Sequence, residues 1–165
     1  MPTMQGVTVH ITRDFKNVPC PRRKLTKLVR VICKRFRLTK ATISIAIVGN
    51  RRMRKLNIEF LNHKNFTDCL AFDLSESKNG PKLLELVING KRAKTQAVKR
   101  GHSPQAELAL YITHGLLHNL GFDDLQPKKA KRMHRIEDEI LQQQGFGLVY
   151  DKKRKIVSNK RRQKC

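Results

Sequence analysis

The chain has 165 residues, enough for about one domain with a single hydrophobic core. Its 36 Lys and Arg against 13 Asp and Glu give a formal charge of +23, which favours a polyanionic partner, chiefly nucleic acid, over a small metabolite. No stretch is long and apolar enough for a membrane-spanning helix, and residues 1–9 are too polar for a signal peptide. The four cysteines include no C-x-x-C pair. We therefore expect a cytoplasmic protein with reduced thiols, an organelle matrix being the alternative.

The first part of the chain alternates strand and helix patterns. Residues 7–11 alternate β-branched and polar side chains and predict a strand. Residues 22–36 repeat apolar side chains at spacings of three and four, with Lys and Arg between them, which predicts an amphipathic helix. Residues 41–48 form a nearly continuous apolar run, typical of a buried strand. Asn50 is then expected to cap a short helix, followed by a polar loop at residues 62–65.

The middle of the chain predicts two strands and a helix. Residues 67–74 and 83–88 have strand patterns, and the Lys-Asn-Gly-Pro sequence at residues 78–81 predicts a turn between them. A helix is expected over residues 91–100.

A long helix should follow, because Ser103 is a good N-cap and Pro104 suits the first helical position. Its apolar side chains indicate burial against the sheet, and Gly121 marks its end. Residues 127–144 predict a last helix with one apolar face.

These elements predict an α+β domain, with a small sheet of about four strands packed against about five helices. The domain should cover residues 1–148. Residues 149–165 are strongly basic and lack apolar periodicity, so we expect them to form a disordered tail.

The most informative motif lies at the end of the long helix. His114 and His118 are four residues apart, so both imidazoles lie on one helix face and can reach a single ion. The turn at Gly121 is followed by Asp123 and Asp124, either of which can approach that ion. Two helical histidines and a ligand from the next turn are typical of a catalytic Zn²⁺ site. The sequence thus predicts a metal site at the C-terminal end of a buried central helix.

Other interpretations of these residues remain open. A helical His pair also occurs in ordinary cores and on surfaces, and His10, His102 and His134 are expected to be structural or solvated. The zinc-protease motif has a Glu after the first His as its general base. This chain has Gly115 there, which disfavours a metalloprotease.

The chain resembles the YbeY-type metal-dependent endoribonucleases, which take part in ribosomal RNA maturation. Their signature, H-G-x-L-H-L-x-G-Y-D-H, is similar to residues 114–124, His-Gly-Leu-Leu-His-Asn-Leu-Gly-Phe-Asp-Asp. A second landmark, T-D-V-L-S-F, corresponds to residues 67–72, Thr-Asp-Cys-Leu-Ala-Phe. Met133 and Glu137 in the last helix also look like the family, and the resemblance covers about residues 7–145.

The resemblance implies one Zn²⁺ per chain, held by His114, His118 and Asp124, which would also be the catalytic group. It further implies a mixed sheet and a positively charged groove. The expected partners are ribosomal RNA and the ribosome or its proteins, and the chain is expected to be a monomer. The family's third ligand is His, whereas this chain has Asp124. A carboxylate is an acceptable zinc ligand, although it makes the ion a weaker Lewis acid.

A second departure concerns the expected substrate groove. Where the family has an Arg six residues before the T-D landmark, this chain has Leu61. His63 and Lys64 are candidates to replace that Arg, and Thr67 and Asp68 are candidate groove residues. The leading interpretation is a zinc-dependent endoribonuclease for ribosomal RNA. Because of Leu61 and Asp124, the alternative is an assembly factor of the same fold that binds RNA or the ribosome with little or no cleavage.

Overall fold

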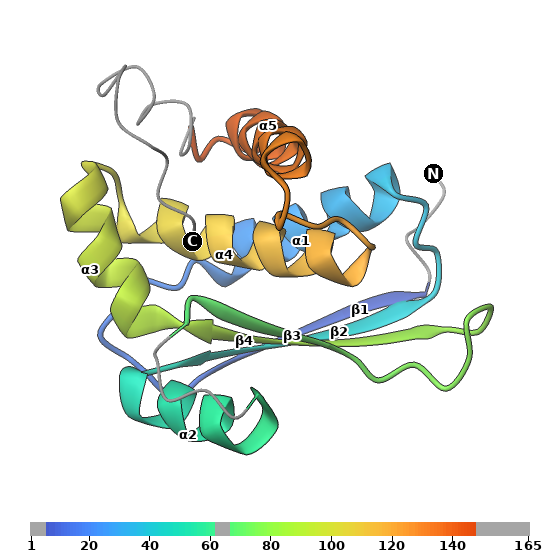
Figure 1. The fold of residues 1–165 in the computed structure, drawn as a ribbon, viewed down its shortest axis with the longest axis horizontal. Helices are drawn as coiled ribbons and strands as arrows, with labels where there is room; N and C mark the ends of the chain where they lie inside the picture. The colour runs from blue at the N-terminus through green and yellow to red at the C-terminus, as the bar shows by residue number, and fades with distance from the viewer. Residues whose placement is uncertain (1–5, 62–66, 148–165) are drawn as a thin grey trace.

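The computed structural model describes residues 6–61 and 67–147, and it has the predicted α+β architecture (Figure 1). One mixed sheet contains the strands β1 (Val7–Arg13), β2 (Ala41–Val48), β3 (Cys69–Asp73) and β4 (Lys82–Asn89). The spatial order is β1-β2-β4-β3. Strands β1, β2 and β4 are parallel, whereas β3 pairs antiparallel with β4 and forms one edge of the sheet.

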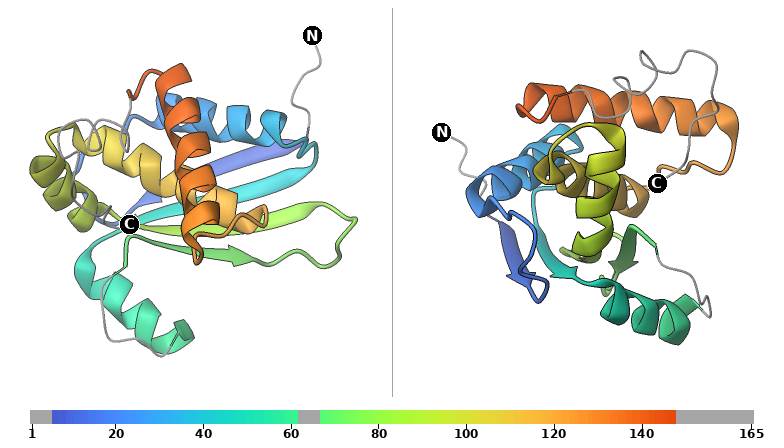
Figure 2. Two further views of the ribbon diagram at one scale, coloured as in Figure 1. Left: turned by 45° about the horizontal axis from the view of Figure 1, so that its top comes forward. Right: turned by 90° about the vertical axis from the view of Figure 1, so that its left-hand side faces the viewer.

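The helices form layers on both faces of this sheet. They are α1 (Arg22–Arg35), α2 (Asn50–Leu61), α3 (Gly90–Arg100), α4 (Pro104–Asn119) and α5 (Pro127–Gln143). Helices α1 and α4 cover one face, with α5 outside them, and α2 lies against the opposite face (Figures 1 and 2). No helix within residues 6–61 and 67–147 is long and apolar enough to cross a membrane.

Helix α4 is the centre of the domain, as predicted. The Ser103 hydroxyl accepts a hydrogen bond from the Ala106 amide at 3.1 Å, and Pro104 follows the cap. Every residue from 106 to 117 is buried, because α4 is enclosed by the sheet on one side and by helices on the other. The helix is therefore apolar around most of its circumference rather than along one stripe.

The predicted boundaries agree closely with the structure, apart from β3. This strand is shorter than the predicted range of 67–74 and begins at Cys69. Just before it, the Asp68 side chain is buried and forms an ion pair with Arg92 of α3. The Asp68 carbonyl still accepts a hydrogen bond from the Asn89 amide at 2.9 Å. The predicted tail, residues 149–165, lies outside the described residues, as do His63 and Lys64.

Candidate metal centre

The two histidines of α4 face the same point, one helical turn apart. The Nε2 atoms of His114 and His118 are 3.0 Å apart, and the rings meet edge-on with centroids separated by 4.5 Å. His114 is buried, whereas about a third of the His118 side chain is exposed. The pair is thus fixed by the helix on one side and open to solvent on the other.

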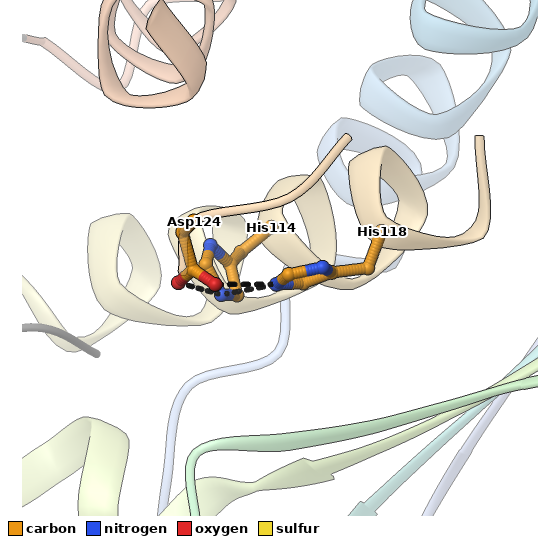
Figure 3. Close-up of side chains that lie close together, drawn as sticks. All are labelled: His114, His118 and Asp124. Atoms are coloured by element: carbon orange, nitrogen blue, oxygen red, sulfur yellow. Dashed lines mark hydrogen bonds and ion pairs between the residues drawn. The ribbon is translucent and has the colours of Figure 1, made fainter. Parts of the chain in front are cut away.

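Asp124 completes the group from the turn that follows α4. Gly121 adopts φ +95°, a left-handed conformation that glycine accepts readily, and its amide bonds the His118 carbonyl at 3.0 Å. The chain then returns toward the helix. The two carboxylate oxygens of Asp124 lie 3.7 Å from Nε2 of His114 and 3.7 Å from Nε2 of His118 (Figure 3). The structure therefore brings the three predicted ligands together.

The donor set fits a divalent cation. One ligand atom from each of His114, His118 and Asp124 lies within 4.8 Å of the others. A tetrahedral zinc ion with ligand distances of about 2.0–2.2 Å separates its ligand atoms by roughly 3.3–3.6 Å. The two Nε2 atoms are 3.0 Å apart, and each lies 3.7 Å from a different carboxylate oxygen of Asp124, so the three groups are close to this spacing. Three protein ligands would leave a fourth position, as catalytic zinc sites do.

A second layer of groups orients both imidazoles. The Nδ1 atom of His118 lies 3.1 Å from the Phe122 carbonyl oxygen, and Nδ1 of His114 lies 3.3 Å from Oε2 of Glu137. The other oxygen of Glu137 lies 2.9 Å from Nδ1 of His134. Carbonyl and carboxylate oxygens only accept, so each partner favours hydrogen on Nδ1 and leaves the Nε2 lone pair directed at the ligand position.

Burial and the charges around this layer shift the pKa values of the two histidines in opposite directions. Burial opposes ionisation of Glu137, but its hydrogen bonds with His114 and His134 outweigh burial and hold its pKa below the ordinary value. Burial likewise lowers the pKa of His114, yet the hydrogen bond and charge of Glu137, together with Asp124, raise it overall. Burial and the neighbouring His114 lower the pKa of His118, so the neutral, ligating form of this imidazole is favoured.

The three groups open into a groove of about 340 Å³. Its walls come from α4, the turn after α4, the end of α2 and the edge strand β3, with the lining residues Leu61, Thr67, Asp68, Cys69, Leu70, Ala71, Phe72, His114, Gly115, His118 and Asp124. The candidate metal centre therefore lies where an extended ligand has access, as expected for a catalytic rather than a structural site.

The backbone of β3 contributes polar groups to this groove. Asp68 and Leu74 make their backbone bonds with Asn89 and Leu83 on the β4 side. In an antiparallel pair, hydrogen-bonded residues alternate with residues whose amides point the other way. Cys69 and Ala71 therefore direct their N–H and C=O groups away from β4 and toward the groove that they line.

Gly115 explains in steric terms why the zinc-protease motif does not fit. A Cβ atom at this position would lie 2.6 Å from Sγ of Cys69 and 2.9 Å from Cδ2 of Leu86. Helix α4 packs directly on the sheet here. There is no space for the glutamate that a metalloprotease has after its first histidine.

The remaining predicted site residues divide into three groups. Leu61 lines the groove with 48% of its surface exposed, so the position that the family fills with Arg does face this space. Thr67 and Asp68 also line it, although the Asp68 carboxylate is paired with Arg92. Burial raises the pKa of Asp68, while Arg92 opposes that effect. His63 and Lys64 cannot be placed, because they lie outside the described residues.

Sequence reasoning assigned no role to Glu137 and expected His134 only to be structural or solvated. Both are buried beside His114 in the structure. A signal was present, because Glu137 interrupts the apolar face of α5 between Met133 and Leu141. A carboxylate on a buried helix face requires a donor or a cation, which indicates a partner on another element.

Comparison with known proteins places these motifs in one family. Residues 10–145 match the family described as Endoribonuclease YbeY. The chain is 36% identical over 138 residues to an Endoribonuclease YbeY of Myxococcus xanthus, covering 81% of this chain and 45% of that protein. A relative from Anaeromyxobacter is 43% identical over 107 residues, covering 64% and 56%. The chain thus spans about half the length of these two relatives. For a relative from Thermobifida fusca, 33% identical over 133 residues, the match covers 75% and 86%.

The fold has also been seen in a solved structure. A solution structure from Thermotoga maritima matches 82% of this chain and 91% of its own chain, with a TM-score of 0.55 and 18% identity. This likeness supports the fold alone. The family match extends across nearly the whole described domain, including the two histidines and the turn of the candidate metal centre. The chain belongs to the Endoribonuclease YbeY family.

Proposed function

We propose that this chain is a zinc-dependent endoribonuclease that acts on ribosomal RNA during ribosome maturation. One observation carries the proposal: His114, His118 and Asp124 converge beside an open groove. The formal charge of +23 favours a polyanionic substrate, and the named activity of the family indicates RNA.

Some residues of such a site would bind the metal, and others would orient those ligands. His114, His118 and Asp124 hold one Zn²⁺ per chain through two Nε2 atoms and a carboxylate oxygen. When bound, the ion polarises a water molecule and stabilises negative charge on the phosphate. Glu137 and the Phe122 carbonyl keep both imidazoles in the ligating orientation. The negative charge of Asp124 makes this ligand set less acidifying than three histidines.

Metal analysis beside an RNA cleavage assay tests this proposal. We expect about one zinc per native chain and chelator-sensitive cleavage, with both lost in His114→Ala. His10→Ala is the matched control, because His10 is exposed on β1, away from the groove lining. Equal metal content in the native chain and His114→Ala would refute the assigned site.

Thr67 and Asp68 shape this groove in our proposal rather than hold phosphate. The Asp68 carboxylate is buried and paired with Arg92, so it stabilises the start of β3 against α3. A negatively charged side chain is also a poor partner for a phosphate.

The second candidate is an RNA- or ribosome-binding assembly factor that keeps the fold with little cleavage. Leu61 favours it, because an apolar side chain faces the groove where the family has an Arg. Arginine binds phosphate through a planar, bidentate fork that leucine lacks. Loss of one such donor costs roughly 10²–10³ in rate. If the rest of the site is intact, Leu61→Arg should raise cleavage. Chelator-insensitive RNA binding without cleavage would support the binding factor.

The basic tail is proposed as a separate, nonspecific contact with RNA phosphate. Residues 151–165 contain eight Lys and Arg and one Asp, whereas residues 1–148 form the catalytic domain. A protein that contacts six to ten phosphates loses about 10³–10⁵ in affinity between 50 and 200 mM salt. Deleting residues 151–165 should flatten this salt dependence without unfolding the monomeric domain. An unchanged slope would show that the tail makes no such contact.

A further inference from the structure

Three large apolar side chains are exposed at the end of α2 that borders the groove. Ile58, Phe60 and Leu61 expose 45%, 56% and 48% of their surface. Leu61 lines the groove together with His114 and His118, and Phe60 precedes it in the chain. Single exposed apolar side chains are ordinary, but the adjacent pair Phe60 and Leu61 at the end of α2, beside a candidate catalytic group, indicates a binding surface.

Phe60 rests on a second aromatic ring from the edge strand. Phe72 of β3 lines the groove, and its ring centroid lies 5.5 Å from that of Phe60 with 63° between the planes. Phe72 also packs against the small buried cluster of Val48, Met53 and Leu70. Phe72 is therefore anchored in the fold, and it supports Phe60, which has more than half of its surface exposed.

We propose that Phe60 and Phe72 form a platform for a nucleobase of the bound RNA, as positioning residues for the phosphate at the metal centre. This inference rests on the proposed function. Nucleobases stack on aromatic rings whatever their sequence. The charge of α2 favours RNA over an apolar protein segment, because Arg51, Arg54 and Lys55 are exposed on the same helix and attract phosphates.

The groove indicates the path of the bound RNA. Phe72 belongs to the edge strand β3 and Phe60 contacts it, and the outward backbone groups of Cys69 and Ala71 lie along the same edge. The platform would hold the base of one nucleotide, while the adjoining RNA backbone reaches the groove. Base stacking of this kind requires a nucleotide that is not paired in a helix, since a paired base cannot present its face.

Substitution of Phe60 tests the platform in the full chain. Phe60→Leu keeps an apolar side chain but removes the flat ring, whereas Phe60→Tyr keeps the ring. The probe is a short single-stranded RNA that contains 2-aminopurine, whose fluorescence falls when it stacks, with and without Zn²⁺. We expect Phe60→Leu to weaken affinity on the order of tenfold and to abolish the quenching. Phe60→Tyr should retain both.

The control is Val98→Ala, since Val98 is 79% exposed on α3 and does not line the groove. It should bind and quench as the native chain does. If Phe60→Leu also binds and quenches like the native chain, the platform is refuted even where native cleavage is intact. If native protein fails to cleave RNA but Phe60→Leu loses affinity and quenching, the platform stands and the nuclease proposal fails.

Discussion

The two ends of helix α4 contain the same types of side chain, a buried glutamate beside a histidine, in different roles. At the N-terminal end, the fully buried Glu107 pairs with Arg100, at 3.2 Å, and with His102. At the C-terminal end, the fully buried Glu137 of α5 pairs with His114, at 3.3 Å, and with a second histidine. Each end thus contains a buried carboxylate beside an imidazole.

The two ends differ in whether the partner of the glutamate has a further atom available to bind a ligand. Arg100 carries a permanent charge and its side chain is 6% exposed, so its pair with Glu107 is shielded from solvent and from any ligand. His114 uses only Nδ1 for Glu137, and its Nε2 remains directed at His118 and Asp124 beside the groove. A buried carboxylate pairs with an arginine at one end and orients a candidate metal ligand at the other.

Removing the shielded pair should have the largest effect. In Glu107→Gln the Arg100 charge stays buried without its counter-ion, so we expect the free energy of unfolding to fall by about 3–5 kcal/mol. Urea denaturation measures it. Glu139→Gln is the control, because its pair with Arg35 is partly exposed and should change stability by less than about 1 kcal/mol. If folded Glu107→Gln protein loses its metal, the two ends are not independent.

The reciprocal change should act on the metal. Glu137→Gln removes the carboxylate that orients His114, and loss of such a partner lowers metal affinity by about 10- to 100-fold. Competition with a chelator of known affinity measures this, with Glu107→Gln as the comparison. Unaltered zinc affinity in Glu137→Gln would mean that His114 is held by packing alone.

The middle of α4 should respond only through packing. Gly115→Ala puts a methyl group against Cys69 and Leu86, and overpacking costs about 1–3 kcal/mol against roughly 1 kcal/mol gained in helix propensity. We expect a net loss of about 0–2 kcal/mol in unfolding free energy. Cys69→Ala in the same chain should recover part of it. A Gly115→Ala protein more stable than the native chain would contradict the close contact between helix and sheet.

Most of the fold and the grouping of His114, His118 and Asp124 could be predicted because their signals are local. Alternation and helical spacing predict the elements, and Ser103 and Pro104 predict where α4 begins. The spacing of His114 and His118 is itself a helix geometry, and the glycine turn brings Asp124 within reach after only a few residues. These contacts follow from bond geometry within one short segment.

The contacts that sequence reasoning did not find join distant segments. Glu137 reaches His114 from a different helix, and Arg92 reaches Asp68 from the helix after the next strand. No periodicity in one segment specifies which buried charge on another segment will meet it. The shortened β3 has the same origin, because the residue before the strand is engaged with α3.

The candidate metal centre is assembled from two kinds of backbone. His114 and His118 are fixed to each other by a helical turn, whereas Asp124 is supplied by the segment beyond Gly121. Exchange of the residue at position 124 therefore alters the charge and hardness of the ligand set while the helical pair keeps its spacing. If the site binds a metal, the segment after α4 would therefore set its metal preference, while the helical pair and the rest of the domain stay unchanged.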